Sequence, residues 1–265
     1  MSFVLRAIRC LPILATVILG QAEQSAAADL GLCDGMVAEV GVPEYLGEDP
    51  PHASLCRLGY VLSVNLETKV PDWVVEDLTA GRLDGPADRG NNPFAADNDL
   101  PVGQRAELSD YKGSGFDRGH MAPAADMKWN DQAMVESFLL SNMAPQVGIG
   151  FNRGIWARLE DRVRSWTLSR GRLIVITGPI HGDEDRRIGE NGVAVPAGFF
   201  KIVFDPEANR AIGFKFQNRK LMGEDIANFV VPIREIEDDT GLDFLAELPK
   251  RRQNLLETSA SAMWR

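Results

Sequence analysis

Residues 113–120 read Gly113-Ser114-Gly115-Phe116-Asp117-Arg118-Gly119-His120. We expect a strand over 116–121, entered through the Gly-Ser-Gly loop. A glycine inside a strand, here Gly119, allows another backbone or a bound molecule to approach closely. The strand therefore brings a histidine and an arginine to a place that a polar ligand can reach.

His120 is the candidate proton acceptor of this stretch. The unperturbed pKa of imidazole lies near neutrality, so the neutral ring can take a proton from water. A lone histidine is more often structural than catalytic, but His120 follows Arg118, whose guanidinium can bind phosphate oxygens bidentately. His52 and His181 lack such neighbours, and we interpret both as surface residues.

Asn152 is the candidate metal ligand. Its amide oxygen suits Mg²⁺, which prefers oxygen ligands and often takes only one or two protein groups. Asn152 would also suit the N-cap of a helix that we expect over 152–167. The residues alone leave both interpretations open.

Glu160 follows eight residues later. On a continuous helix it would lie about 12 Å along the axis from Asn152, which argues against direct binding of one ion by both side chains. We expect Glu160 to hold water beside the ion or to orient an arginine. The alternative is a solvent-facing glutamate paired with Arg164 at i,i+4.

Two further polar residues complete the set of candidates. Arg89 lies in the long segment 81–105, rich in Gly, Pro, Asn and Asp, and long ordered loops are often functional. Its charge makes it a second phosphate ligand beside Arg118, although loop arginines are usually only solvated. We interpret Asp117 as a structural acceptor. A proton acceptor, an oxygen ligand for a hard cation and arginine charge are the parts that phosphodiester hydrolysis needs.

The charge distribution fits a polyanionic substrate only locally. The chain carries a formal net charge of −10, which repels nucleic acid at long range. Residues 112–172, however, contain nine basic and six acidic residues. The segment that holds the candidate residues is therefore the basic part of an acidic protein.

The N-terminus predicts export. Arg6 and Arg9 precede the apolar stretch Leu11–Gly20, and Ala26-Ala27-Ala28 offers a cleavage site before Asp29, which together are typical of a signal peptide. The alternative is an uncleaved anchor. We expect a periplasmic or secreted protein of 237 residues after loss of residues 1–28, without stable membrane association. Cys33 and Cys56 would form a disulfide in an oxidising compartment, and two free thiols are the alternative.

The remaining pattern indicates one α+β domain over 56–250, after an irregular arm at 29–55 and before a frayed tail at 251–265. Tyr60–Asn65 reads as a strand, and Trp73–Leu78 as a short helix or the start of a strand. We expect a helix over 131–141 capped by Asp131, a strand over 173–176 that stops at Gly178-Pro179, and a helix over 243–248. Strands at 198–204 and 211–216 flank a turn.

Three motifs occur in a fixed order. They are Asp117-Arg118-Gly119-His120-Met121-Ala122-Pro123, Leu140-Ser141-Asn142-Met143-Ala144-Pro145-Gln146, and Asn152-Arg153-Gly154-Ile155-Trp156 with Leu159-Glu160. The stretches 110–116, 177–179 and 195–201 add to them. This set resembles the DNA/RNA non-specific endonuclease family, which includes mitochondrial endonuclease G and secreted bacterial nucleases. The resemblance covers about 56–248 and implies the ββα-metal fold, a central antiparallel sheet flanked by helices.

The resemblance also implies roles. His120 would be the proton acceptor, and Asn152 the only protein ligand of Mg²⁺, with Mn²⁺ as a substitute. Glu160 matches the acid that supports the waters around the ion, and Arg89 matches the arginine that contacts the phosphate. The substrates would be DNA and RNA, cut to leave 5′-phosphates, and a homodimer is left open. The alternatives are an exported nucleic-acid-binding module without turnover and a phosphodiesterase for small substrates.

Overall fold

The computed structural model describes residues 33–90 and 93–264. The expected signal peptide, residues 1–28, lies outside these ranges. Within them, no helix combines the length and the apolar character that a membrane crossing requires.

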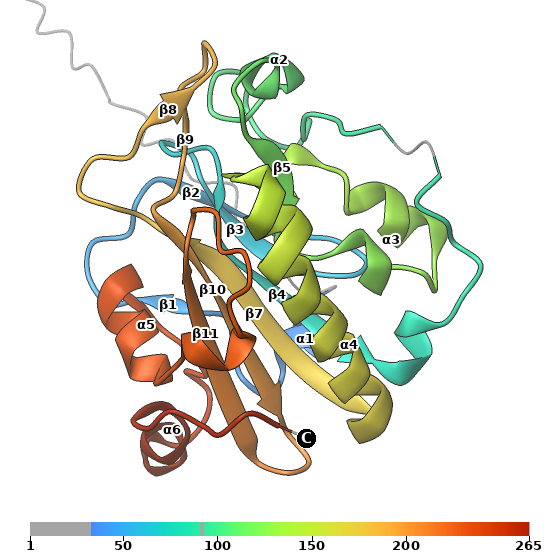
Figure 1. The fold of residues 1–265 in the computed structure, drawn as a ribbon, viewed down its shortest axis with the longest axis vertical. Helices are drawn as coiled ribbons and strands as arrows, with labels where there is room; N and C mark the ends of the chain where they lie inside the picture. Colours follow the sequence, from blue (N-terminus) through green and yellow to red (C-terminus); the bar gives the residue numbers. More distant parts are fainter. Residues whose placement is uncertain (1–32, 91–92, 265) are drawn as a thin grey trace, which may run out of the picture.

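A seven-stranded antiparallel sheet forms the centre of the molecule (Figure 1). Its order is β12-β11-β10-β7-β4-β3-β2, and every neighbouring pair is antiparallel. The predicted α+β class with a central antiparallel sheet is confirmed. The strands are β2 (His52–Cys56), β3 (Val61–Asn65), β4 (Pro71–Thr79), β7 (Arg172–Ile180), β10 (Gly198–Asp205), β11 (Arg210–Gln217) and β12 (Val230–Val231).

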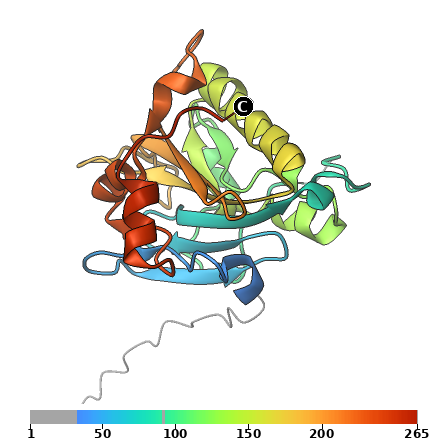
Figure 2. The same cartoon turned by 90° about the horizontal axis from the view of Figure 1, so that it is seen from below.

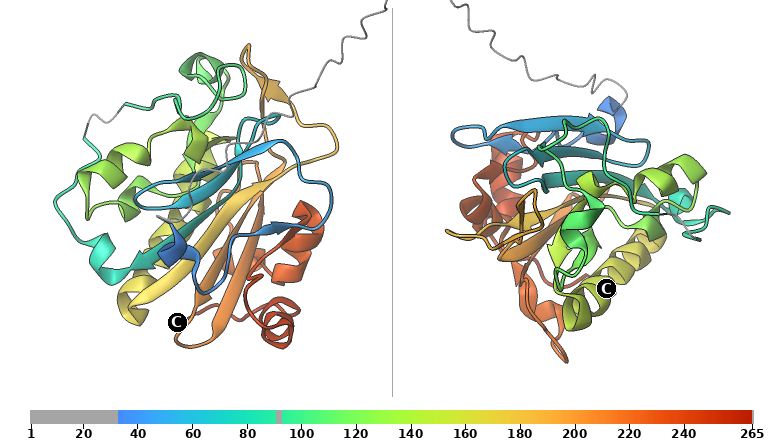
Figure 3. Two further views of the ribbon diagram at one scale, coloured as in Figure 1. Left: turned by 180° about the vertical axis from the view of Figure 1, so that it is seen from behind. Right: turned by 90° about the horizontal axis from the view of Figure 1, so that it is seen from above.

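Both faces of the sheet are covered. Along β7, Leu173 and Val175 belong to one hydrophobic core, whereas Ile174 and Ile176 belong to the core on the other face. The helix α4 (Ala157–Arg170) runs along the first face (Figures 1 and 2). On the opposite face, seen from behind in Figure 3, lies the N-terminal segment with α1 (Asp34–Val37) and β1 (Glu44–Tyr45).

Two antiparallel strands carry the first two motifs above the first face. They are β5 (Asp117–His120) and β6 (Met143–Gln146), in the register His120↔Met143. The chain between them forms η3 (Ala124–Asp126), α3 (Asp131–Glu136) and η4 (Leu140–Asn142). The remaining elements are η2 (Ala80–Leu83), α2 (Leu108–Tyr111), η5 (Gly148–Trp156), β8 (Arg187–Ile188), β9 (Val193–Ala194), η6 (Ile226–Phe229), α5 (Ile233–Thr240), β13 (Leu242–Asp243) and α6 (Lys250–Glu257).

Several expected boundaries are wrong near β5 and β6 and in β7. α3 ends at Glu136, and its N-cap is Asn130, whose side chain accepts from the Gln132 amide (2.8 Å). The expectation that Asp131 caps this helix was therefore one residue off. β7 continues past Gly178-Pro179, because β4 pairs with it only as far as Thr177, and proline is tolerated where a strand has a free side.

The arm and the tail are more ordered than expected. The last residues of the arm, from His52, belong to the edge strand of the sheet, which runs on to Cys56. Residues 243–248 do not form a helix, since Leu245 has a φ of 53°, outside the right-handed helical region. The helix begins instead at Lys250, and the tail after it does not fray entirely: Trp264 is buried and packs on Trp166 with ring centroids 5.1 Å apart.

Cys33 and Cys56 form the predicted disulfide, with their Cα atoms 5.8 Å apart. The bridge joins α1 to the edge strand β2 across a sequence separation of 23 residues.

The Cys33→Ser/Cys56→Ser double variant should be less stable than the oxidised protein. Opening a loop of this size restores entropy to the unfolded chain, worth about 3 kcal/mol. Urea unfolding followed by tryptophan fluorescence measures the difference. The reduced wild type is the matched control and should unfold near the variant; a variant as stable as the oxidised protein would contradict the expectation.

Candidate active site

One cleft collects every predicted site residue. It has a volume of about 640 Å³ and is lined, among others, by Arg89, Arg118, His120, Asn152 and Glu160. Lys112, Arg153 and Asp117 also line it, so four basic and two acidic side chains surround the opening. The cleft is therefore locally cationic in an acidic chain, as the charge pattern of 112–172 predicted.

Asn152 is held by Asp117. Its Nδ2 donates to Asp117 Oδ2 at 2.9 Å, and the same carboxylate pairs with Arg153 Nε at 2.9 Å. Because the amide nitrogen is fixed in this way, the amide oxygen is left for a cation in the cleft. The N-cap interpretation of Asn152 is wrong, since α4 begins only at Ala157. Asp117 is the acceptor that we predicted, and the side chains that it holds are those of Asn152 and Arg153.

An interruption of the helix brings Asn152 and Glu160 to the same cleft. Arg153 and Gly154 have non-helical backbone angles, so the continuous helix expected over 152–167 is wrong. Glu160 lies in the first turn of α4 and is half-buried. The solvent-facing alternative is also wrong, because Arg164 pairs with Asp126 (2.9 Å) and Asp161 instead.

Beneath Glu160 lies a buried lysine that sequence reasoning missed. Lys201 is 1 % exposed; its Nζ donates to Thr177 Oγ1 at 2.5 Å and lies 5.0 Å from the centre of the Trp156 ring. Burial raises the pKa of Glu160 to about 7, and the charge of Lys201 opposes that rise. The only sequence signal was the position of Lys201 at the end of the stretch 195–201.

His120 is enclosed by two aromatic rings. The centroid of its ring lies 5.7 Å from that of Phe94 and 5.3 Å from that of Phe138. Its Nε2 is buried and has no hydrogen-bond partner among the described residues. Burial, followed by the charges of Arg89 and Arg118, lowers the pKa of His120 to about 3. The ring is therefore neutral at physiological pH, the state that a proton acceptor requires.

The same aromatic rings hold the two arginines. The guanidinium of Arg118 lies 4.1 Å from the centre of the Phe94 ring, and that of Arg89 lies 5.3 Å from the centre of the Phe138 ring. Neither arginine has an ion-pair partner in the described part of the chain. Their charges are thus free to meet an anionic ligand.

Close packing fixes the strand that carries His120. A Cβ at Gly119 would lie 2.1 Å from Gln146 Cδ, so the group that approaches this glycine is the buried Gln146 side chain. At the other end, Asn142 Oδ1 accepts from the Ala122 amide at 2.9 Å. Both Gly113 and Gly115 adopt positive φ in the entry loop, where glycine is strongly favoured.

The other two histidines stay away from the cleft, as expected, but neither is a fully exposed surface residue. His52 is half-buried, and its ring lies 5.2 Å from that of Tyr45. The His181 side chain is 29 % exposed and pairs with Asp185.

Comparison with known proteins agrees with this geometry. Residues 43–251 match the model of the DNA/RNA non-specific endonuclease family. Nuclease C1 of Cunninghamella echinulata is 40 % identical over 72 % of this chain and 82 % of its own length. Human mitochondrial endonuclease G is 37 % identical over 78 % of this chain and 74 % of its own. A crystal structure of an EndoG/EndoGI complex aligns with a TM-score of 0.76 and 32 % identity, covering 85 % of this chain and 96 % of that one.

The fold and the cleft define a metal-dependent nuclease of the ββα-metal type. The chain belongs to the DNA/RNA non-specific endonuclease family. It is a hydrolase that acts on nucleic acid, which removes the alternative of a binding module without turnover.

The relatives correct one prediction. A periplasmic or secreted location was expected from residues 1–28, but several relatives are named as mitochondrial nucleases, among them those of Saccharomyces cerevisiae, Schizosaccharomyces pombe and human. A basic and apolar N-terminus is ambiguous as a targeting signal when read by composition alone.

Asp117→Ala should weaken metal binding while it leaves Asn152, the predicted ligand, in place. The Asn152 amide then loses its acceptor and can rotate, and loss of such a supporting contact typically costs about 10–100-fold in metal affinity. The Mg²⁺ concentration at half-maximal cleavage should rise by that factor. Asp117→Asn, which keeps an acceptor oxygen, is the matched control and should shift it less; an unchanged Mg²⁺ dependence of Asp117→Ala would contradict the role of Asp117.

Proposed function

We propose that this protein hydrolyses phosphodiester bonds of DNA and RNA, with little sequence preference, in the cleft between β5 and α4. The observation that carries the proposal is that a neutral His120 and the Asn152 amide, whose nitrogen is already engaged by Asp117, line the same cationic cleft. The arginines suit phosphate groups, which are the same in every nucleotide. Binding through them is therefore consistent with weak sequence preference.

His120 acts as the general base. It removes a proton from the water that attacks phosphorus. The bond from phosphorus to the 3′-oxygen breaks, the phosphate stays on the 5′ side, and the 3′-oxygen takes a proton from solvent water to become a hydroxyl. Since Nε2 is buried, Nδ1 is the nitrogen available to the cleft. The surrounding rings and arginines keep the imidazole unprotonated before the reaction.

Asn152 holds the divalent cation, which we propose to be Mg²⁺. When bound, such an ion neutralises phosphate charge and stabilises the leaving oxygen. The donor set fits a hard cation, because it offers an amide oxygen whose nitrogen is already engaged and Mg²⁺ keeps several waters. Glu160 accepts hydrogen bonds from water in the cleft, and Arg89 and Arg118 bind the phosphate oxygens.

The test is cleavage of plasmid DNA and of RNA by the purified protein. We expect both to be shortened in Mg²⁺, Mn²⁺ to substitute, and EDTA to abolish the reaction. A chromogenic small phosphodiester, assayed in parallel, separates this function from that of a small-substrate phosphodiesterase. Rapid turnover of the small diester with intact plasmid and RNA would overturn the proposal.

A homodimer stays a prediction. Sedimentation velocity of the purified protein tests it independently of activity, and a monomer at all accessible concentrations would remove it.

A further inference from the structure

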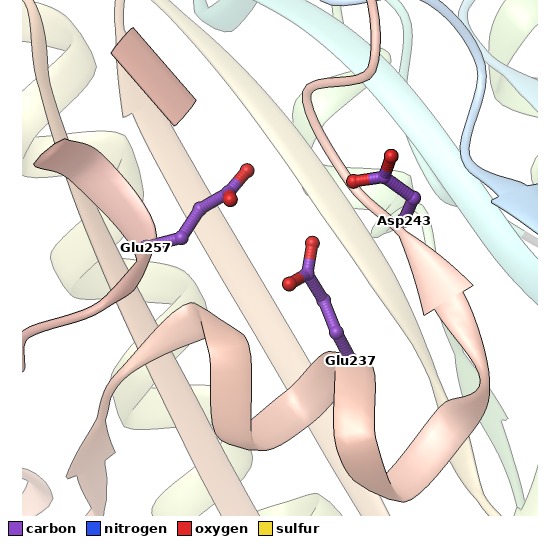
Figure 4. Close-up of side chains that lie close together, drawn as sticks. All are labelled: Glu237, Asp243 and Glu257. Atoms are coloured by element: carbon purple, nitrogen blue, oxygen red, sulfur yellow. The ribbon is translucent and has the colours of Figure 1, made fainter. Parts of the chain in front are cut away.

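Three carboxylates from separate elements meet far from the cleft. They belong to Glu237 of α5, Asp243 of β13 and Glu257 of α6, and they point toward a common space (Figure 4). One carboxylate oxygen from each residue can be taken such that all three lie within 4.8 Å of one another. The side chains of Glu257 and Glu237 are 0 % and 1 % exposed. Buried carboxylates are costly unless they are paired or bind a cation.

The basic residues around this cluster do not balance it. Arg234 pairs with Glu237 at 2.9 Å and with Glu257 at 2.7 Å, while Lys250 pairs with Asp243 at 2.8 Å. Two cations thus face three carboxylates, and the Lys250 side chain is 72 % exposed, so solvent screens its charge. With all three carboxylates ionised, the cluster therefore carries more negative than positive charge.

Several buried side-chain oxygens of β13 and α6 have no hydrogen-bond partner among the described residues. Glu257 Oε1 and Asp243 Oδ1 are buried, and neither accepts a hydrogen bond from any described residue. Gln253, one turn before Glu257 on α6, is fully buried; its Nε2 donates to the Leu245 carbonyl at 2.9 Å, whereas its Oε1 has no partner in the described ranges. Buried acceptors without partners are rare in native proteins and call for an ion or a water.

We propose that Glu237, Asp243 and Glu257 bind one Ca²⁺ ion at a site separate from the catalytic cleft. The ion takes oxygen ligands at about 2.3–2.6 Å, so oxygens on opposite sides of it lie about 5 Å apart, and the observed spacing fits. Mg²⁺ fits less well, because it keeps several waters and these carboxylates are buried. None of the three residues lines the cleft.

An ion at this position would join the last helix to the rest of the domain. It would bridge α5, α6 and β13. The strand β13 is in turn hydrogen-bonded to β1, with Asp243 opposite Glu44 in the register. The C-terminal helix and the N-terminal segment would both gain an anchor. The expected property is therefore a calcium-dependent increase in stability.

The test uses the Asn152→Ala protein, which lacks the proposed catalytic ligand. Its thermal midpoint in CaCl₂ at about 100 times the dissociation constant should exceed that in EDTA by about 5–10 °C. Isothermal titration should show one Ca²⁺ per chain. In Asn152→Ala/Glu257→Gln both signals should vanish, although the new amide oxygen can still accept from Arg234.

The matched control is Asn152→Ala/Glu235→Gln, because Glu235 lies on α5, as Glu237 does, but pairs with Lys215 instead. It should keep the full calcium response. Asp243→Asn in the Asn152→Ala background serves as a second variant if Glu257→Gln does not fold. Calcium stabilisation that survives loss of Glu257 or Asp243, or its absence from the Asn152→Ala protein, overturns the proposal. If calcium does not stabilise the Asn152→Ala protein and its thermal midpoint rises as the pH is lowered toward about 6, the carboxylates share a proton instead of an ion.

Discussion

Replacing His120 with alanine should lower the rate of plasmid cleavage by about 10²–10⁴-fold, the usual contribution of a positioned general base. Binding of nucleic acid should persist, because Arg89, Arg118 and the remaining basic residues of the cleft are untouched. Cleavage under saturating Mg²⁺ and fluorescence anisotropy with labelled DNA measure the two properties separately.

The control for this variant is His181→Ala, which removes a half-buried histidine outside the cleft and should cleave at the wild-type rate. The wild-type pH profile adds a second check. Because the pKa of His120 is lowered to about 3, protonation of this ring should not reduce the rate between about pH 5 and 8. Near wild-type cleavage by His120→Ala would contradict the role of His120 as base. A fall in the wild-type rate below about pH 6.5 that the variant does not show would contradict its lowered pKa.

Strands of the sheet were predictable where an apolar run is bounded by turn-forming residues within one short segment. Strands β10 and β11 were placed to within one residue because a polar turn over 205–209 separates two apolar runs. The end of α3 was not, because Phe138 continues the apolar spacing of the helix yet packs against His120 instead. Leu245 similarly reads as part of a helix, but its backbone is left-handed. Tertiary contacts override local propensity at both places.

The candidate residues of the site were predictable, whereas the contacts between them were not. The motifs named Arg118, His120, Asn152 and Glu160, and the long loop added Arg89. The structure brings all five to one cleft; their catalytic roles stay predictions. The break at Gly154 has no strong local signal, since isolated glycines occur within helices. Two contacts join residues far apart in the sequence: Lys201 lies beneath Glu160, and Asn152 donates to Asp117. The spacing of motifs along the chain does not reveal such contacts.

Replacing Asn152 with alanine should remove most metal-dependent cleavage, by about 10²–10³-fold, since the transition-state charge loses its main stabiliser. Asn152→Asp offers a carboxylate, ordinarily a good Mg²⁺ ligand, yet we expect it to be nearly as impaired. Asn152 donates to the Asp117 carboxylate at 2.9 Å, so a second carboxylate there would be repelled.

The two residues can be exchanged to test this geometry. In Asp117→Asn/Asn152→Asp, the amide at 117 can donate to the carboxylate at 152, which restores the hydrogen bond with reversed polarity and leaves one oxygen for the ion. We expect this double variant to cleave faster than Asn152→Asp, a positive coupling in a double-mutant cycle over Mg²⁺-dependent rates. Additive losses would mean that the bond between these side chains does not position the ligand. Wild-type Mg²⁺ dependence in Asn152→Ala would mean that the ion is held elsewhere.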